Sequence, residues 1–181
     1  QSKGTTVRRT LRITLALILA TAVGAGIATA AGAVLTARTG TISERQTFIT
    51  ENVAWSTSAA AYVNVPGATI SFVVPSGTTR IVDTRYTAET QCTGTTGWCT
   101  VRVVYFGPAG GPFELNPVSG TDFAIDSSNP GGNDLWEGHA IERSTYRLGA
   151  GSYRFQVQAR VVGATSLRLD DWHFAGELIR P

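Results

Sequence analysis

The chain has 181 residues, of which 43% are hydrophobic and 15% charged, and its formal net charge is +2. The hydrophobic content excludes a wholly disordered protein. We see no collagen-type period, heptad run or long repeat, which excludes fibrous and solenoid architectures. The length fits one domain with a tail.

Positive charge is concentrated at the N-terminal end. Four basic residues precede the first apolar run, and the rest of the chain carries 11 basic and 13 acidic residues. The body therefore has no basic stripe, which argues against a nucleic-acid partner.

Residues 13–37 form a run of 25 residues without a charge. About 20 apolar residues span a bilayer as a helix, and the basic residues 1–12 before it predict a cytoplasmic N-terminus. The run is either a retained transmembrane anchor or a signal peptide with a cleavage site after Ala28-Thr29-Ala30. Both alternatives place the body outside the cytoplasm, either secreted or anchored in the plasma membrane.

Two cysteines, Cys92 and Cys99, flank a six-residue stretch that contains two glycines. In an oxidising compartment such a pair closes a small disulfide loop, which stabilises the fold by roughly 2–3 kcal/mol. A metal or redox pair usually has two intervening residues. We therefore expect a disulfide.

The remaining chain divides into two parts. Residues 38–60 are rich in Ser, Thr and Ala and are predicted to form a stalk or a first edge strand, with a strand-like run at 46–50. Residues 61–181 alternate between apolar and polar positions and are punctuated by Gly and Pro, which predicts a β-domain.

Eight or nine strands are expected in this domain, with the clearest period of two at 153–161. In chain order they lie near residues 62–65, 70–74, 82–88, 101–105, 123–125, 139–148, 153–161 and 167–178. No helical period follows residue 37. We predict an all-β, antiparallel β-sandwich of jelly-roll type, preceded by one N-terminal hydrophobic helix.

The alternation changes phase in the last strand, because Leu169 and Trp172 cannot both face inward along a regular strand. Either a β-bulge near Asp170-Asp171 shifts the phase, or a carboxylate points into the core.

Several segments carry a family resemblance, namely Tyr62–Gly67, Glu89–Cys99, Pro117–Phe123 and Leu169–Trp172. With them, the body resembles a group of exported bacterial domains of unknown function, of the kind found in actinobacterial genomes. The resemblance implies an exported jelly roll and transfers no active site. A weaker likeness, carried by Leu169-Asp170-Asp171, is to jelly-roll carbohydrate-binding modules. Trimeric jelly rolls of the tumour-necrosis-factor type are similar at the level of the fold alone.

An oxygen-rich loop between two predicted strands is a candidate calcium site, and no other cofactor is expected. Calcium takes six to eight oxygen ligands, whereas Asx residues with Pro and Gly also form ordinary solvated turns. The candidate ligands are Asp126, Asn129, Asn133, Asp134 and Glu137.

Two tryptophans in loops are candidate binding residues. Trp98 lies in the cysteine loop and Trp136 in the oxygen-rich loop, beside Asp134. An exposed indole provides a platform for a sugar ring or a protein partner. Alternatively, each indole packs against an end of the sandwich.

Enzymatic motifs are sparse. No nucleophile elbow is found, a disulfide would remove the cysteine thiolates, and a zinc site would have to recruit both His139 and His173. A glycoside hydrolase would need a facing carboxylate pair, with candidates among Asp134, Glu137, Asp170 and Asp171.

The sequence therefore predicts a non-enzymatic, extracytoplasmic binding domain at the cell surface, with a carbohydrate or protein partner. The alternative is a structural or accessory subunit of a membrane or extracellular assembly, with residues 13–37 in the membrane if uncleaved. A secreted hydrolase comes third. A homo-oligomer is compatible with either of the first two.

Overall fold

The structure is a computed structural model, and it describes residues 39–49, 53–121, 123–129 and 135–181. The expected N-terminal helix lies outside these residues. Residues 38–181 form a single unit. In the described part of the chain, we find no helix with the length and hydropathy required to cross a membrane.

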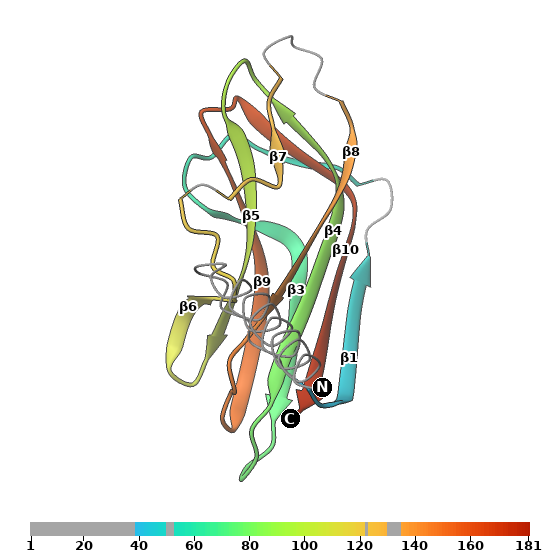
Figure 1. Cartoon of the computed structure of the whole chain (residues 1–181), viewed down its shortest axis with the longest axis vertical. Coiled ribbons are helices and arrows are strands. Elements are labelled where there is room, and N and C mark those ends of the chain that lie inside the picture. Colours follow the sequence, from blue (N-terminus) through green and yellow to red (C-terminus); the bar gives the residue numbers. More distant parts are fainter. Residues whose placement is uncertain (1–38, 50–52, 122, 130–134) are drawn as a thin grey trace, which may run out of the picture. The chain divides into compact units, whose positions relative to one another are not determined.

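Two antiparallel sheets pack face to face (Figure 1), as the sequence predicted for a β-sandwich. In spatial order, sheet A contains β1 (Thr41–Ile49), β10 (Ser166–Arg180), β4 (Ile81–Thr93) and β8 (Glu137–Ser144), and β2 (Trp55–Thr57) also pairs with β10. Sheet B contains β3 (Val63–Val74), β9 (Gly151–Val162), β5 (Trp98–Gly107) and β6 (Gly110–Glu114), and β7 (Asp126–Ser127) pairs with β5.

The period-two alternation of the strands produces the core, because alternate side chains point to the same side of a sheet. From sheet B, Phe155 is fully buried and meets Phe72 edge-to-face with ring centroids 6.0 Å apart. From sheet A, Tyr86 packs against Phe174 in the same geometry at 6.3 Å. Burying each such aromatic side chain contributes about 1.5–3 kcal/mol.

A β-bulge in β10 explains the change of phase in the last strand. The pairing of β10 with β4 shifts register between Asp170 and His173, and Asp171 has a φ of 43°. The extra residue turns both Leu169 and Trp172 into the core, where they are 0% and 3% exposed. Asp171 is exposed, so the bulge is confirmed and the inward-pointing carboxylate is not found.

Some strand boundaries differ from the predictions. The strand expected at 123–125 lies slightly later, as β7. The amide of Ile125 donates to the carbonyl of Cys99 at 2.9 Å, and the residues that pair with β5 are the next two, Asp126 and Ser127. No strand was predicted between residues 105 and 123, yet β6 lies there, and its Phe113 ring packs with its centroid 5.3 Å from that of Tyr105. The strand expected at 139–148 is shorter at its end, because β8 stops at Ser144. The side-chain hydroxyl of the next residue, Thr145, accepts a hydrogen bond from the amide of Val82 at 2.9 Å.

Candidate functional site

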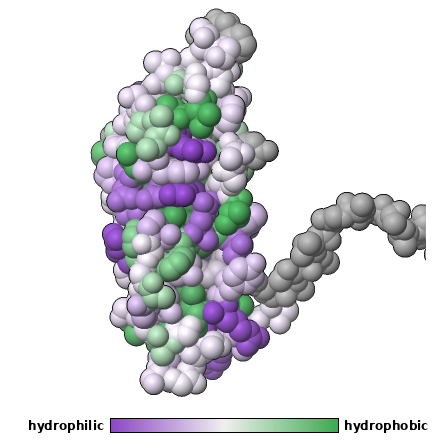
Figure 2. Space-filling view, turned by 90° about the vertical axis from the view of Figure 1, so that its left-hand side faces the viewer, coloured by the Kyte–Doolittle hydropathy of each residue, from purple (hydrophilic) through white to green (hydrophobic). Residues whose placement is uncertain are grey.

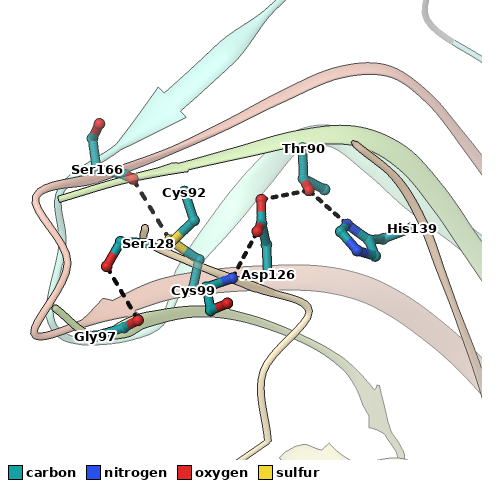
Figure 3. Close-up of a disulfide and its surroundings, with 9 residues drawn as sticks. Thr90, Cys92, Gly97, Cys99, Asp126, Ser128, His139 and Ser166 are labelled. Atoms are coloured by element: carbon teal, nitrogen blue, oxygen red, sulfur yellow. Dashed lines mark hydrogen bonds between the residues drawn. A yellow bond between two sulfur atoms is a disulfide. The ribbon is translucent and has the colours of Figure 1, made fainter. Parts of the chain in front are cut away.

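The cysteine pair joins the two sheets at one end of the sandwich (Figure 3). Cys92 is the penultimate residue of β4 in sheet A and Cys99 the second residue of β5 in sheet B, and their sulfur atoms are 2.07 Å apart. The turn between them needs glycine at position 97, where φ is 113° and a Cβ would collide with the carbonyl oxygen of Val162. The predicted disulfide is therefore supported.

A chain of polar contacts lies beside the disulfide (Figure 3). The fully buried hydroxyl of Thr90 donates to Asp126 Oδ2 at 2.7 Å and lies 2.7 Å from His139 Nδ1. Because its single proton goes to the carboxylate, the hydroxyl must accept a hydrogen bond from Nδ1. The other ring nitrogen is 3.4 Å from the carboxylate of Glu137. These contacts hold β7 and β8 against β4, and the burial of Thr90 argues against a nucleophilic role.

These contacts bear on the predicted calcium ligands. Asp126 Oδ1 accepts the backbone amide of Ser127 at 2.6 Å, so both of its oxygens already have protein partners. Among the described residues, no group of three His, Cys, Asp or Glu side chains is suited to hold a metal. Asn133 and Asp134 lie outside the described residues, and calcium binding stays a prediction.

The two candidate tryptophans differ in exposure. Trp136 is 43% exposed, and the guanidinium of Arg168 lies 4.5 Å from its ring centroid. Arg168 in turn bonds Asp170 Oδ2 at 3.1 Å. Trp98 is half-buried, and its indole N–H is buried without an acceptor. Trp136 is therefore the more exposed of the two, although Arg168 lies over its ring, and Asp134 falls outside the described residues.

A groove that the sequence analysis missed crosses the outer face of sheet A. It has a volume of about 440 Å³. Residues from all four main strands of the sheet and from the segment after β6 line it: Arg45, Asp83, Thr84, Arg85, Asn116, Pro117, Glu142, Arg143, Ser144, Ala175 and Glu177.

Strand register places the charged groups of the groove in two rows. In the first row, the strand register places Glu177 opposite Arg45 of β1 on one side and opposite Asp83 of β4 on the other. Arg45 Nη1 lies 3.7 Å from Glu177 Oε1. In the second row Arg85 Nε donates to Glu142 Oε1 at 2.6 Å. The Arg85 and Glu142 side chains are 60% and 64% exposed. Such exposed pairs contribute about 0–1 kcal/mol to stability, so folding alone gives little reason for them.

Two carboxylates stand directly opposite each other in this groove. Glu177 of β10 pairs with Asp83 of β4 in the antiparallel ladder. Like charges at opposed positions destabilise a sheet. The groove thus combines adjacent acceptors with guanidinium donors, of which Arg45 contacts Glu177 and Arg85 contacts Glu142.

One wall of the groove comes from the segment after β6. Asn116 is fixed to Ser144 by two backbone hydrogen bonds of 2.8 Å, which place this segment alongside the edge strand β8. Arg143 also lines the groove. Burial lowers the pKa of Arg143, while the charges of Glu114 and Tyr62 raise it.

Sequence reasoning missed the groove because its residues come from distant parts of the chain. The sequence did carry one sign of a polar surface there: polar or charged residues occupy successive outward-facing positions of a strand, as in Asp83 and Arg85 or Glu142 and Ser144. Which strands lie side by side depends on the register, and single strands do not reveal it.

Comparisons with known proteins give little beyond the general fold. No family model and no curated protein matches the chain. Similar solved structures include latent PorU from Porphyromonas gingivalis (TM-score 0.42, 13% identity, 84% of this chain and 14% of that chain). Another is from infectious bursal disease virus (TM-score 0.36, 10% identity, 86% and 37%). A third is the CBM22-1 xylan-binding domain from Paenibacillus barcinonensis Xyn10C (TM-score 0.34, 10% identity, 81% and 99%). These scores are too low to support an argument about function.

Proposed function

We propose that this protein is a non-catalytic binding domain whose groove on the outer face of sheet A holds a carbohydrate. The observation that carries the proposal is the groove itself, with three carboxylates and three guanidinium groups among its lining residues. Its volume of about 440 Å³ falls in the range of small-molecule sites, roughly 300–1,000 Å³.

The lining matches the hydrogen-bonding character of sugars. A sugar hydroxyl both donates and accepts, and here acceptor carboxylates lie next to donor guanidinium groups, as in Glu142 and Arg85. Sugar hydroxyls could also donate to Asp83 and Glu177, which stand opposite each other in the ladder. Charge-assisted hydrogen bonds of this kind are among the stronger polar contacts.

The same groove favours binding over catalysis. Two of its three carboxylates, Glu142 and Glu177, form ion pairs with Arg85 and Arg45, an arrangement that suits the recognition of polar groups. In its described lining there is no histidine or cysteine.

The proposal includes export and a jelly-roll topology. The uncharged run 13–37 behind a basic end and the disulfide between Cys92 and Cys99 both support a location outside the cytoplasm. Leaving out the short β2 and β7, the strand orders β1-β10-β4-β8 and β3-β9-β5-β6 support the jelly roll, because they place the first strand beside the last in one sheet.

The test is isothermal titration of the full-length chain with three soluble oligosaccharide series: neutral xylo-, acidic galacturono- and cationic chito-oligosaccharides. We expect saturable binding to at least one series, weakened about tenfold or more in Arg85→Gln, since a charge-assisted hydrogen bond contributes about 1.5–3 kcal/mol. Each variant is compared by circular dichroism with the unmodified chain.

Arg154→Gln is the matched control. Arg154 is also exposed, but it lies on β9 of sheet B. This variant should bind as tightly as the unmodified chain. The proposal would be contradicted if none of the three series binds, or if Arg85→Gln and Arg154→Gln lose the same amount of affinity.

A second candidate function, that of an accessory subunit, is supported by β1. This nine-residue strand is the edge of sheet A, and Ile42, Phe48 and Ile49 are 53%, 46% and 62% exposed. An exposed edge with apolar side chains can accept a strand from another protein. Cross-linking from a cysteine placed at Thr47 would recover a partner chain if this function holds, and none if it does not.

A further inference from the structure

Several polar side-chain atoms on sheet B, on β8 and on the segments beside them are buried without a partner. Six of the described atoms of this kind belong to residues of β5, β8, β9 and the segments beside them. They are Tyr62 Oη, Trp98 Nε1, Thr100 Oγ1, Ser119 Oγ, Arg143 Nε and Arg160 Nε. All six can donate a hydrogen bond.

The Tyr62 ring is at the centre of this group. The guanidinium of Arg102 lies 3.8 Å from the ring centroid and that of Arg160 lies 4.6 Å from it. Thr100, which is 1% exposed, stands opposite Arg160 in the pairing of β5 with β9. Two cations and two unpartnered hydroxyls therefore meet on the outer face of sheet B.

Glu114 links Arg102, beside the Tyr62 ring, to Ser119 in the segment after β6. Its Oε2 lies 3.3 Å from Arg102 Nη1, and its Oε1 accepts the amide of Ser119 at 2.6 Å. The hydroxyl of Ser119, which is 4% exposed, has no acceptor. Arg143 of β8 borders the group: its guanidinium lies 4.7 Å from the ring centroid of Phe123, and it also lines the groove of sheet A. The charges of Glu114 and Tyr62 act to raise its pKa against the lowering effect of burial.

We call the residues Tyr62, Arg102, Glu114, Arg143 and Arg160 the arginine cluster. Its described members carry three guanidinium groups and a single carboxylate, and all five are half-buried. Leaving a buried donor without an acceptor costs about 1–3 kcal/mol. Positive charge in excess and unused donors in the same place both call for an acceptor that carries negative charge.

We propose that the arginine cluster binds an oxyanion: a phosphate, a sulfate or the carboxylate of an acidic sugar. Arginine suits such groups because its planar fork donates to two oxygens at once. The cluster lies on the β5 and β6 side of the sandwich, the side on which Figure 2 shows hydrophilic residues in a band at mid-height. The proposal does not depend on a carbohydrate in the groove of sheet A.

The experiment measures the thermal unfolding of the full-length chain in inorganic phosphate against sodium chloride of matched ionic strength. If the dissociation constant is about 2 mM, about 20 mM phosphate shifts the folding equilibrium roughly tenfold, which raises Tm by about 4 °C. The rise should saturate with concentration. Parallel series with inorganic sulfate and with galacturonate identify which oxyanion is preferred.

Variants separate a specific site from general screening. Arg160→Gln and Arg143→Gln should each lose the phosphate-dependent rise, measured against their own Tm in chloride, so that a change in basal stability does not matter. Arg160→Lys should keep only part of the rise, because lysine retains the charge and lacks the fork.

Two controls should keep the full rise. Arg154 stacks on Phe106 at 4.4 Å and Glu142 lies in the groove, and neither belongs to the cluster. Hence Arg154→Gln and Glu142→Gln are expected to respond like the unmodified chain. The proposal is overturned if none of the three oxyanions raises Tm above chloride, or if Arg154→Gln loses the rise together with Arg160→Gln.

Discussion

The outer faces of the two sheets follow the same alternation but hold their charged side chains in different ways. The strands of sheet A carry eight carboxylates and five arginines, whereas those of sheet B carry two carboxylates and three arginines. On sheet A, Arg85 pairs with Glu142 across neighbouring strands. On sheet B, Arg154 lies 4.4 Å over the ring of Phe106 and Arg160 4.6 Å over that of Tyr62.

This difference shows how one architecture supports two kinds of surface. Carboxylate–arginine pairs leave sheet A with acceptors and donors side by side, which suits a ligand rich in hydroxyl groups. Arginines stacked on aromatic rings keep their charge and part of their hydrogen-bonding capacity, which suits an anion. The carbohydrate proposed for the groove therefore lies on sheet A, whereas the proposed oxyanion lies mainly on sheet B, with Arg143 of β8 bordering both sites.

The largest expected effects concern the shared interior, where the sheets should not differ. Phe174→Ala in sheet A and Phe155→Ala in sheet B each remove a fully buried ring. Both should lower the free energy of unfolding by about 3–5 kcal/mol. Denaturant titration of the two variants gives the comparison. A large loss in one sheet and a negligible loss in the other would mean that the core is not shared equally.

Removal of the disulfide comes next, because this bond connects the two sheets directly. Cys92→Ser combined with Cys99→Ser should lower the free energy of unfolding by about 2.5 kcal/mol, the chain-entropy value for so short a loop. Chemical denaturation checks the value, and reduction of the unmodified chain should give a similar loss. An unchanged unfolding midpoint would show that the polar contacts of Thr90 and Asp126 hold the two sheets without the disulfide.

Removing the hydroxyl from either of two buried tyrosines should change the free energy of unfolding in opposite directions. Tyr86 of sheet A has a buried hydroxyl without a partner, whereas the hydroxyl of Tyr153 of sheet B donates to the carbonyl of Gly149 at 3.0 Å. Tyr86→Phe should therefore raise the free energy of unfolding by about 1 kcal/mol, and Tyr153→Phe should lower it by about 1 kcal/mol. Changes of the same sign in both variants would contradict this assignment of hydrogen bonds.

Alkaline pH sharpens the contrast at Tyr86. Burial raises the pKa of Tyr86, so the unfolded chain loses this proton first, near pH 10. The contribution of Tyr86 to stability is thus complete below about pH 10 and is lost as the pH rises further. Tyr86→Phe should unfold at a higher pH than the unmodified chain in an alkaline titration followed by circular dichroism. Identical alkaline midpoints would argue against the burial of this hydroxyl.

The smallest expected effects compare the surface pairs themselves. A double-mutant cycle on Arg85 and Glu142 should give about 0.5 kcal/mol of coupling that disappears in about 0.5 M salt. The cycle on Arg154 and Phe106 should give about 0.5–1 kcal/mol and persist at the same salt concentration, since part of a cation–π contact is packing. If both couplings respond equally to salt, the distinction between the two faces is lost.

Local patterns were sufficient to predict much of the fold. The alternation of Tyr153, Phe155 and Val157 identified the inward face of β9, because side-chain direction in a strand depends only on sequence position. The change of phase near Asp170 identified the bulge for the same reason. The spacing of Cys92 and Cys99 was sufficient for the disulfide.

The candidate site could not be predicted in the same way. The groove depends on the pairing of β1, β10, β4 and β8, and the register between distant strands is a property of the whole fold. The arginine cluster depends on contacts of Tyr62 with Arg102 and Arg160, which are 40 and 98 positions away in the chain. The segment with β6 was missed because Gly and Pro dominate it, although Phe113 could have indicated packing.

The most direct test of the central claim is a map of amide NMR chemical shifts in the full-length chain during titration with the xylo-, galacturono- and chito-oligosaccharides. If the groove of sheet A is the carbohydrate site, the largest shifts should fall on Asp83–Arg85 of β4, Glu142–Ser144 of β8 and Ala175–Glu177 of β10. Shifts centred on Trp136 and Arg168, shifts confined to sheet B, or no shift with any series would contradict the account.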